Sequence, residues 1–185
     1  NEEITYFDMN KFIEIKIIDG YHSVVFHVET MRVFLMKKLD YSINAKNNQR
    51  EIDFCINYQN NCFMKFYGFV KSKKNDKIIY QFLCNNALSS KVKYMNEFHL
   101  FPLIIRLFRG ISYLHSHSLI HRDLHSLNIL FDNDFRAYIT DFETIRKINQ
   151  ENEQKDFFTY DFGKIQFASP EQMEGNPISF STDIY

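Results

Sequence analysis

Two polar side chains stand five residues apart in a stretch that has the features of a loop. Asp123 and Asn128 lie in residues 121–128, and an apolar run at 129–131 follows them. In a loop of this kind an aspartate accepts the proton of an attacking hydroxyl, and an asparagine holds a Mg²⁺ ion that shields the migrating phosphate. The pair therefore predicts phosphoryl transfer, with Asp123 as the base and Asn128 as a metal ligand.

A third charged group should reach the same place through a hairpin. A polar turn at 132–134 separates two short apolar runs, 129–131 and 137–140, which is typical of paired strands. Because a hairpin brings its two ends together, we expect Asp141 to return beside Asn128. Its carboxylate would be a second oxygen ligand for a hard cation such as Mg²⁺.

The motifs around these residues occur in a fixed order. Residues 121–128 match H-R-D-L-x-x-x-N, residues 141–143 resemble D-F-G with Glu143 in place of glycine, and residues 168–171 resemble A-P-E. The chain thus resembles the protein kinases, and most closely the tyrosine-kinase-like serine/threonine kinases. The resemblance implies ATP and Mg²⁺ as cofactors, Asp123 as the catalytic base, and Asn128 and Asp141 as metal ligands. It also implies that the ring of His121 packs against Phe142.

The same resemblance assigns a nucleotide site to the N-terminal part of the chain. Residues 34–37 resemble V-A-I-K, which implies that Lys37 holds phosphates and pairs with Glu51; a shifted register would select Lys38 instead. Residues 18–25 take the place of the glycine-rich loop, and residues 79–83 that of the hinge, with Tyr80 as its gatekeeper. The implied nucleotide contacts are Gly20, Val25, Leu35, Lys37, Gln81, Leu83 and Leu130.

Hydrophobic periodicity predicts the elements that carry these residues. Alternating apolar residues indicate strands between 12 and 39, at 63–70 and at 78–82, and the pattern over 45–58 indicates a helix with Glu51 and Cys55 on one face. Helical spacing of Phe101, Ile104, Ile105, Phe108, Ile111 and Leu114 indicates a core helix with Pro102 in its first turn.

Strands followed by helices predict an α+β fold. The resemblance implies a two-lobe kinase-like architecture, with the β-rich small lobe and hinge over residues 1–83 and the first part of a helical large lobe over residues 84–185. Residues 181–185 resemble the start of the helix that forms the floor of the large lobe, so we expect a truncated domain. Apolar surface left without a partner costs about 25 cal/mol per Å². The isolated 185-residue chain is therefore expected to be unstable or to aggregate.

Composition narrows the class of partner. The chain is 45% hydrophobic and its formal net charge is −1, which supports a packed core and gives no electrostatic reason to expect nucleic acid or a membrane surface as a partner. Three cysteines without metal-ligand spacing predict reduced thiols, and the chain has no long apolar run. We expect a cytoplasmic protein, with a nuclear location as the alternative. The implied partners are ATP and a protein substrate, and no oligomeric state is predicted.

Two interpretations of function remain open at this point. One is a protein kinase that transfers the γ-phosphate of ATP to a Ser or Thr hydroxyl. The alternative is a pseudokinase that serves as a nucleotide-binding or scaffolding module, favoured by Glu143, by Leu35 and by the loss of glycines around Gly20.

The segment between Asp141 and residue 171 leaves a second choice open. A phosphate on Thr159 or Tyr160 would pair with Arg122, or the hydroxyls of this segment, including that of Thr144, are incidental features of a solvated loop. Lys164 is expected to supply the phosphate contact of a lysine that the family carries where this chain has His125. The four histidines between 115 and 125 are assigned to the motif, a helix end and a loop rather than to a metal site.

Overall fold

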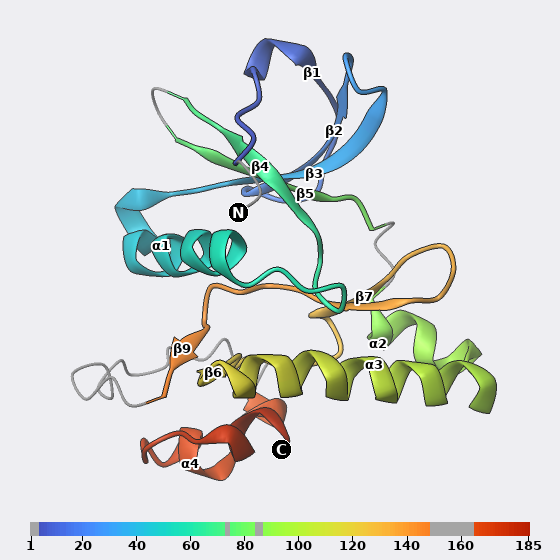
Figure 1. The fold of residues 1–185 in the computed structure, drawn as a ribbon, viewed down its shortest axis with the longest axis vertical. Coiled ribbons are helices and arrows are strands. Elements are labelled where there is room, and N and C mark those ends of the chain that lie inside the picture. The colour runs from blue at the N-terminus through green and yellow to red at the C-terminus, as the bar shows by residue number, and fades with distance from the viewer. Residues whose placement is uncertain (1–3, 73–74, 84–86, 149–164) are drawn as a thin grey trace. The chain divides into compact units, whose positions relative to one another are not determined.

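The computed structural model describes residues 4–72, 75–83, 87–148 and 165–185 (Figure 1). The chain forms two compact units, Asn1–Cys84 and Asn85–Tyr185, and the boundary predicted from the sequence follows residue 83. The first unit is built on a sheet, and the second on a long helix with short strands. This is the α+β architecture that the order of strands and helices predicted.

A five-stranded antiparallel sheet forms the first unit, in the order β1-β2-β3-β5-β4. Its strands contain many Val, Ile, Phe and Tyr residues, whose branched or aromatic side chains favour an extended backbone. The predicted strands are confirmed, with small differences at their ends. Their bounds are β1 Phe12–Ile17, β2 His22–His27, β3 Arg32–Lys38, β4 Phe66–Val70 and β5 Lys77–Gln81, and a short helix, η1 Met9–Lys11, precedes them.

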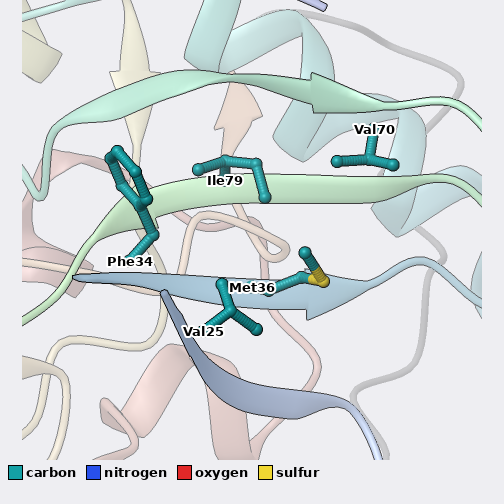
Figure 2. Close-up of a cluster of buried hydrophobic side chains, with 5 residues drawn as sticks. All are labelled: Val25, Phe34, Met36, Val70 and Ile79. Atoms are coloured by element: carbon teal, nitrogen blue, oxygen red, sulfur yellow. The ribbon is translucent and has the colours of Figure 1, made fainter. Parts of the chain in front are cut away.

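One face of this sheet packs into a hydrophobic cluster made by Val25, Phe34, Met36, Val70 and Ile79. Figure 2 shows these side chains along four neighbouring strands, and each is 3% exposed or less. The cluster fixes the strand register, because a slip of one residue would turn every one of these side chains to the opposite face.

The edge strand β1 keeps its isoleucines in solvent. Ile13, Ile15 and Ile17 are between 56% and 64% exposed. Their alternation correctly predicted a strand. The pairing of β1 with β2 shifts between Glu14 and Lys16, so that the three isoleucines do not share one face.

The helix α1, Tyr41–Asn57, follows β3 and contains most of the helix predicted over 45–58. Glu51 and Cys55 are both buried on it. They share one side of the helix because residues four apart lie one turn above each other, as the sequence pattern predicted.

The second unit is organised by α3, Glu97–Ser116. The side chain of Asn96 accepts a hydrogen bond from the backbone N–H of His99 and so caps the first turn. The prediction that Pro102 lies in the first turn is wrong, because this cap starts the helix earlier and leaves the proline in its interior. The missing proline N–H removes one bond of the helical ladder there.

The buried side of α3 also differs from the prediction. Its buried residues are Leu103, Gly110 and Leu114, of which only Leu114 had been assigned to the core. Phe101 and Phe108 are 70% and 56% exposed. The helical spacing was correct, but the sequence carries two apolar faces, and the buried one belongs to Leu103 rather than to Phe101.

Short elements complete the second unit. Ile129, Phe131 and Ala137 pack with Leu103 in a hydrophobic cluster, which ties the hairpin of β7 and β8 to α3. In the part of the chain that the structure describes, no helix is both long and apolar enough to span a membrane. The remaining elements are α2 Leu88–Lys91, η2 Val92–Tyr94, β6 Leu119–Ile120, β7 Ile129–Phe131, β8 Ala137–Ile139, β9 Arg146–Lys147, η3 Ile165–Phe167, α4 Pro170–Met173 and η4 Phe180–Asp183.

Candidate active site

The acid and the amide of the predicted loop lie together between β6 and β7. The side-chain Nδ2 of Asn128 donates to the backbone oxygen of Asp123 at 2.9 Å and to its carboxylate Oδ2 at 3.1 Å. Asn128 is buried, and Asp123 is partly exposed. Because Nδ2 faces Asp123, the Oδ1 arm of the same amide points away from that bond and remains the oxygen with which Asn128 can bind a cation.

The predicted hairpin of β7 and β8 forms, and it brings the backbone immediately before Asp141 back to Asn128. Ile129 pairs with Ile139, and the backbone N–H of Thr140 donates to the carbonyl of Asn128 at 3.0 Å. Asp141 is the next residue and has a φ of 65°. A residue other than glycine in this left-handed region costs roughly 1–2 kcal/mol, so the surrounding structure must hold Asp141 in place.

His121 and Phe142, one from each of the two predicted motifs, pack against each other. Their ring centroids are 5.9 Å apart in an edge-to-face arrangement, and both side chains are buried. The Nε2 of His121 lies 3.1 Å from the carbonyl of Thr140, and since a carbonyl only accepts, Nε2 carries the proton. The predicted packing role of His121 is confirmed.

Arg122 is held in a strained backbone conformation from two sides. Its φ is 74°. Its N–H donates to Asp183 Oδ1 at 2.8 Å, and its carbonyl accepts from Gln172 Nε2 at 3.0 Å. Asp183 Oδ2 also accepts from the N–H of His121 at 2.9 Å and lies 3.0 Å from His115 Nε2.

Asp183 therefore supports the candidate site through the backbone, a role that the sequence analysis did not identify. It is buried and fixes the two backbone groups that immediately precede Asp123. The backbone N–H groups that it holds lie 61 and 62 positions away along the chain, so no local pattern could have linked them.

The structure pairs Lys37, and not Lys38, with Glu51. The ammonium Nζ donates to Oε2 at 2.8 Å and to Oε1 at 3.0 Å, and both side chains are buried. A buried ammonium needs such a partner, because an unpaired charge there would cost several kcal/mol. The pair joins β3 to α1 within the first unit.

The strand register separates Val25 from the lysine. Val25 pairs with Phe34 and packs in the hydrophobic cluster, whereas Val24 pairs with Leu35. Directly paired residues share a face and successive residues alternate, so Val24 and Leu35 lie on the face of Lys37 and Val25 lies on the other. The structure thus does not bring Val25 to the predicted nucleotide contacts. The motif register had selected Val25, but the pairing of β2 with β3 puts the adjacent Val24 on that face instead.

The turn before β2 is closed by its own carboxylate. Asp19 Oδ1 accepts from the backbone N–H groups of Tyr21 and His22, both at 2.7 Å, and Oδ2 lies 3.0 Å from His22 Nδ1. Partial burial works to raise the pKa of Asp19, but these hydrogen bonds outweigh it and lower that pKa below its usual value. Gly20 is exposed, and a Cβ there would meet open space.

The other predicted nucleotide contacts lie on β5, after β5 and on β7. Gln81 is the last residue of β5, and its backbone N–H donates to Lys65 at 2.8 Å. Leu83 is buried just beyond the strand, and Leu130 is partly exposed in β7 opposite Tyr138.

His125 is fixed beside the predicted base. The N–H of Leu127 donates to its Nδ1 at 3.2 Å, which places the ring proton on Nε2, and Nε2 lies 3.5 Å from Asp123 Oδ2. Thr144 donates to the carbonyl of His121 at 2.7 Å, so its hydroxyl has a structural partner. The hydroxyls of Thr159 and Tyr160 and the amine of Lys164 lie outside the described residues.

The donor set can accept a hard cation only with help from a ligand. Within the described ranges, no group of three or more His, Cys, Asp or Glu side chains is placed to hold a metal. Asn128 and Asp141 contribute oxygen atoms, which suit Mg²⁺, and Mg²⁺ takes its remaining ligands from water and phosphates in sites of this type. The residues therefore fit a magnesium ion that arrives with a nucleotide.

Comparisons with known proteins agree with these motifs. The model of a family described as "Protein kinase domain" matches residues 16–185. MAP3K epsilon protein kinase 2 of Arabidopsis thaliana is 29% identical over 74% of this chain, and serine/threonine-protein kinase polo of Drosophila melanogaster is 28% identical over 87%. LRR receptor-like serine/threonine-protein kinase ERL1 of Arabidopsis thaliana is 27% identical over 92%. The chain spans 10%, 29% and 19% of the lengths of these three relatives.

Proposed function

Because this chain belongs to the protein kinase family, we propose that it transfers the γ-phosphoryl group of ATP to a Ser or Thr hydroxyl of a protein. The observation that carries the proposal is the contact between Asn128 and Asp123, with Asp141 closely following the strand that pairs back to Asn128. Asn128 donates directly to Asp123. Asp141 directly follows Thr140, whose backbone N–H donates to the carbonyl of Asn128.

Each residue has a separate task in this proposal. Asp123 accepts the proton of the attacking hydroxyl, and the bond from Asn128 orients its carboxylate for that step. Lys37, held by Glu51, binds phosphate oxygens of the nucleotide. Asn128 and Asp141 would hold Mg²⁺, which supplies positive charge that offsets the charge of the phosphates.

The choice of Ser and Thr as acceptors rests on similarity. The relative from Drosophila melanogaster and the receptor-like relative from Arabidopsis thaliana are both named serine/threonine-protein kinases. Residues 125–127, His-Ser-Leu, also differ from the Ala-Ala-Arg or Arg-Ala-Ala that dedicated tyrosine kinases favour between the aspartate and the asparagine.

A second candidate function is nucleotide binding without transfer, as in a scaffolding pseudokinase. The closed turn at Asp19 favours it, because the backbone N–H groups of Tyr21 and His22 are already bonded to a carboxylate. These groups would have to change partner before they could bind phosphate.

Phosphotransfer by the full-length protein tests the first proposal. We expect label from the γ-phosphate of ATP to appear in a Ser/Thr-containing acceptor protein in the presence of Mg²⁺, and Asp123→Asn to reduce the rate at least about 100-fold, since it removes the base. The matched control is Asp134→Asn, which makes the same change on an exposed turn residue. Nucleotide binding with no transfer by the unmodified protein would instead support the scaffold.

A further inference from the structure

The buried carboxylate of Glu51 is held by more than the lysine. The hydroxyl of Tyr80 donates to Glu51 Oε1 at 2.7 Å, the same oxygen that Lys37 Nζ reaches at 3.0 Å. Tyr80 lies on β5, Lys37 on β3 and Glu51 on α1. The carboxylate therefore joins α1 to two neighbouring strands rather than to one.

A cysteine extends this arrangement. The Sγ of Cys55 lies 3.1 Å from the Tyr80 hydroxyl. The single phenolic hydrogen is directed to Glu51, because a carboxylate can only accept, so the phenolic oxygen is left to accept the S–H of Cys55. The result is a directional chain from the thiol through the phenol to the carboxylate, which the ammonium of Lys37 meets from the other side.

The pKa shifts of Tyr80 and Cys55 agree with this direction of donation. Burial raises the pKa of Tyr80 well above its usual value, and the neighbouring Cys55 and Glu51 raise it further. Burial, followed by the charge of Glu51, raises the pKa of the Cys55 thiol. Tyr80 and Cys55 therefore keep their hydrogens and remain donors at physiological pH.

We propose that Tyr80 and Cys55 are positioning residues for Lys37: they orient the carboxylate of Glu51 through the phenolic hydroxyl, and Glu51 in turn holds the ammonium where phosphate must bind. This inference rests on the proposed nucleotide-binding role of Lys37. It gives Tyr80 a function that depends on its hydroxyl and not on the bulk of its ring. The hydrogen bond from the Tyr80 hydroxyl to Glu51 also connects α1 to β5, whereas Lys37 connects α1 to β3.

The substitution Tyr80→Phe tests the proposal, because it removes the hydroxyl and keeps the ring. The full-length protein should lose about tenfold in affinity for ADP, the effect typical of one hydrogen bond to a charged group, while its affinity for adenosine changes less than about twofold. Adenosine lacks the phosphates that Lys37 would bind, so a merely structural defect would weaken both ligands together. Equal effects on ADP and adenosine, or no effect on either, would overturn the proposal.

The matched control is Tyr138→Phe, which removes another hydroxyl bonded to a carboxylate, Asp132 Oδ2 at 3.0 Å, from the second unit. It should leave the ratio of the two affinities unchanged. Cys55→Ala should shift the ratio in the same direction as Tyr80→Phe but by less, because a thiol is a weak donor.

A thermodynamic cycle separates this inference from the proposed function. Tyr80→Phe is combined with Lys37→Met, or with Lys37→Arg should the methionine variant not fold, and the unfolding equilibrium constant is measured without nucleotide. Because the two residues share one hydrogen-bond network, the effect of the double substitution on the unfolding equilibrium constant should differ by about fivefold from the product of the two single effects. If the unmodified protein binds no nucleotide, the proposed function fails, and coupling in this cycle still decides whether Tyr80 acts on Lys37. Additive effects would contradict that action.

Discussion

A single carboxylate, that of Asp183, fixes the backbone next to Asp123, the proposed base. The two carboxylate oxygens of Asp183 accept hydrogen bonds from the backbone N–H groups of His121 and Arg122. The side chain of Gln172 donates a hydrogen bond to the Arg122 carbonyl. Arg122 thereby keeps a positive φ that an arginine avoids on its own. The position of Asp123 thus depends on Asp183 and Gln172, to which the proposed reaction assigns no step.

The substitution Asp183→Asn should loosen this loop, although the new side chain has nearly the same volume as the old one. An amide has one oxygen to accept with, so one of the two backbone N–H groups would face an NH₂ group and lose its partner, at a cost of about 2 kcal/mol. We expect hydrogen exchange at the amides of His121 and Arg122 to become at least tenfold faster. Asp134→Asn is the control, and unchanged exchange in Asp183→Asn would contradict the role given to Asp183.

At the scale of elements, the sequence patterns correctly predicted the features that depend on neighbouring residues. The strands of the first unit, the helix that carries Glu51 and the hairpin that returns Asp141 followed from alternation, helical spacing and turn residues. Two features depended on competition between equal alternatives and were not predictable. Val24 and Val25 offer the same side chain in successive positions, and α3 has two apolar faces. Packing against distant elements chose between them.

The register of β2 gives a paired prediction. Val25→Ala should lower the free energy of unfolding by about 2 kcal/mol, because it opens a cavity in the hydrophobic cluster of Figure 2. Val24→Ala should change the affinity for adenosine, since Val24 shares the face of Leu35 and Lys37. Calorimetric titration and denaturant unfolding of both variants would measure these effects. A ligand effect confined to Val25→Ala would contradict the observed register.

At the scale of the whole molecule, each unit contains part of the proposed machinery. The first unit supplies the Lys37–Glu51 pair, and the second supplies Asp123, Asn128 and Asp141. The second unit also exposes a row of apolar side chains on α3, where Phe98 is 86% and Phe101 70% exposed. Exposed apolar surface of this kind favours association with another molecule over contact with water.

The 185-residue chain is therefore expected to self-associate when expressed alone. Replacing Phe98 and Phe101 together by Glu should reduce the mass measured by light scattering at a given concentration, because two charges would interrupt the apolar row. Met31→Glu is the control, since Met31 is 74% exposed but lies in the first unit. Equal scattering by the double variant and the unmodified chain would show that α3 is not the associating surface.

The bond from Asp183 to the loop also sets an order of events during synthesis. A ribosome releases residues 121–128 well before Asp183 emerges, and until then the Arg122 backbone has no carboxylate to hold its unfavourable conformation. The nascent chain thus carries Asp123 and Asn128 in a loop whose backbone Asp183 does not yet hold. If the proposed phosphoryl transfer requires this loop shape, it becomes possible only after Asp183 has been synthesised.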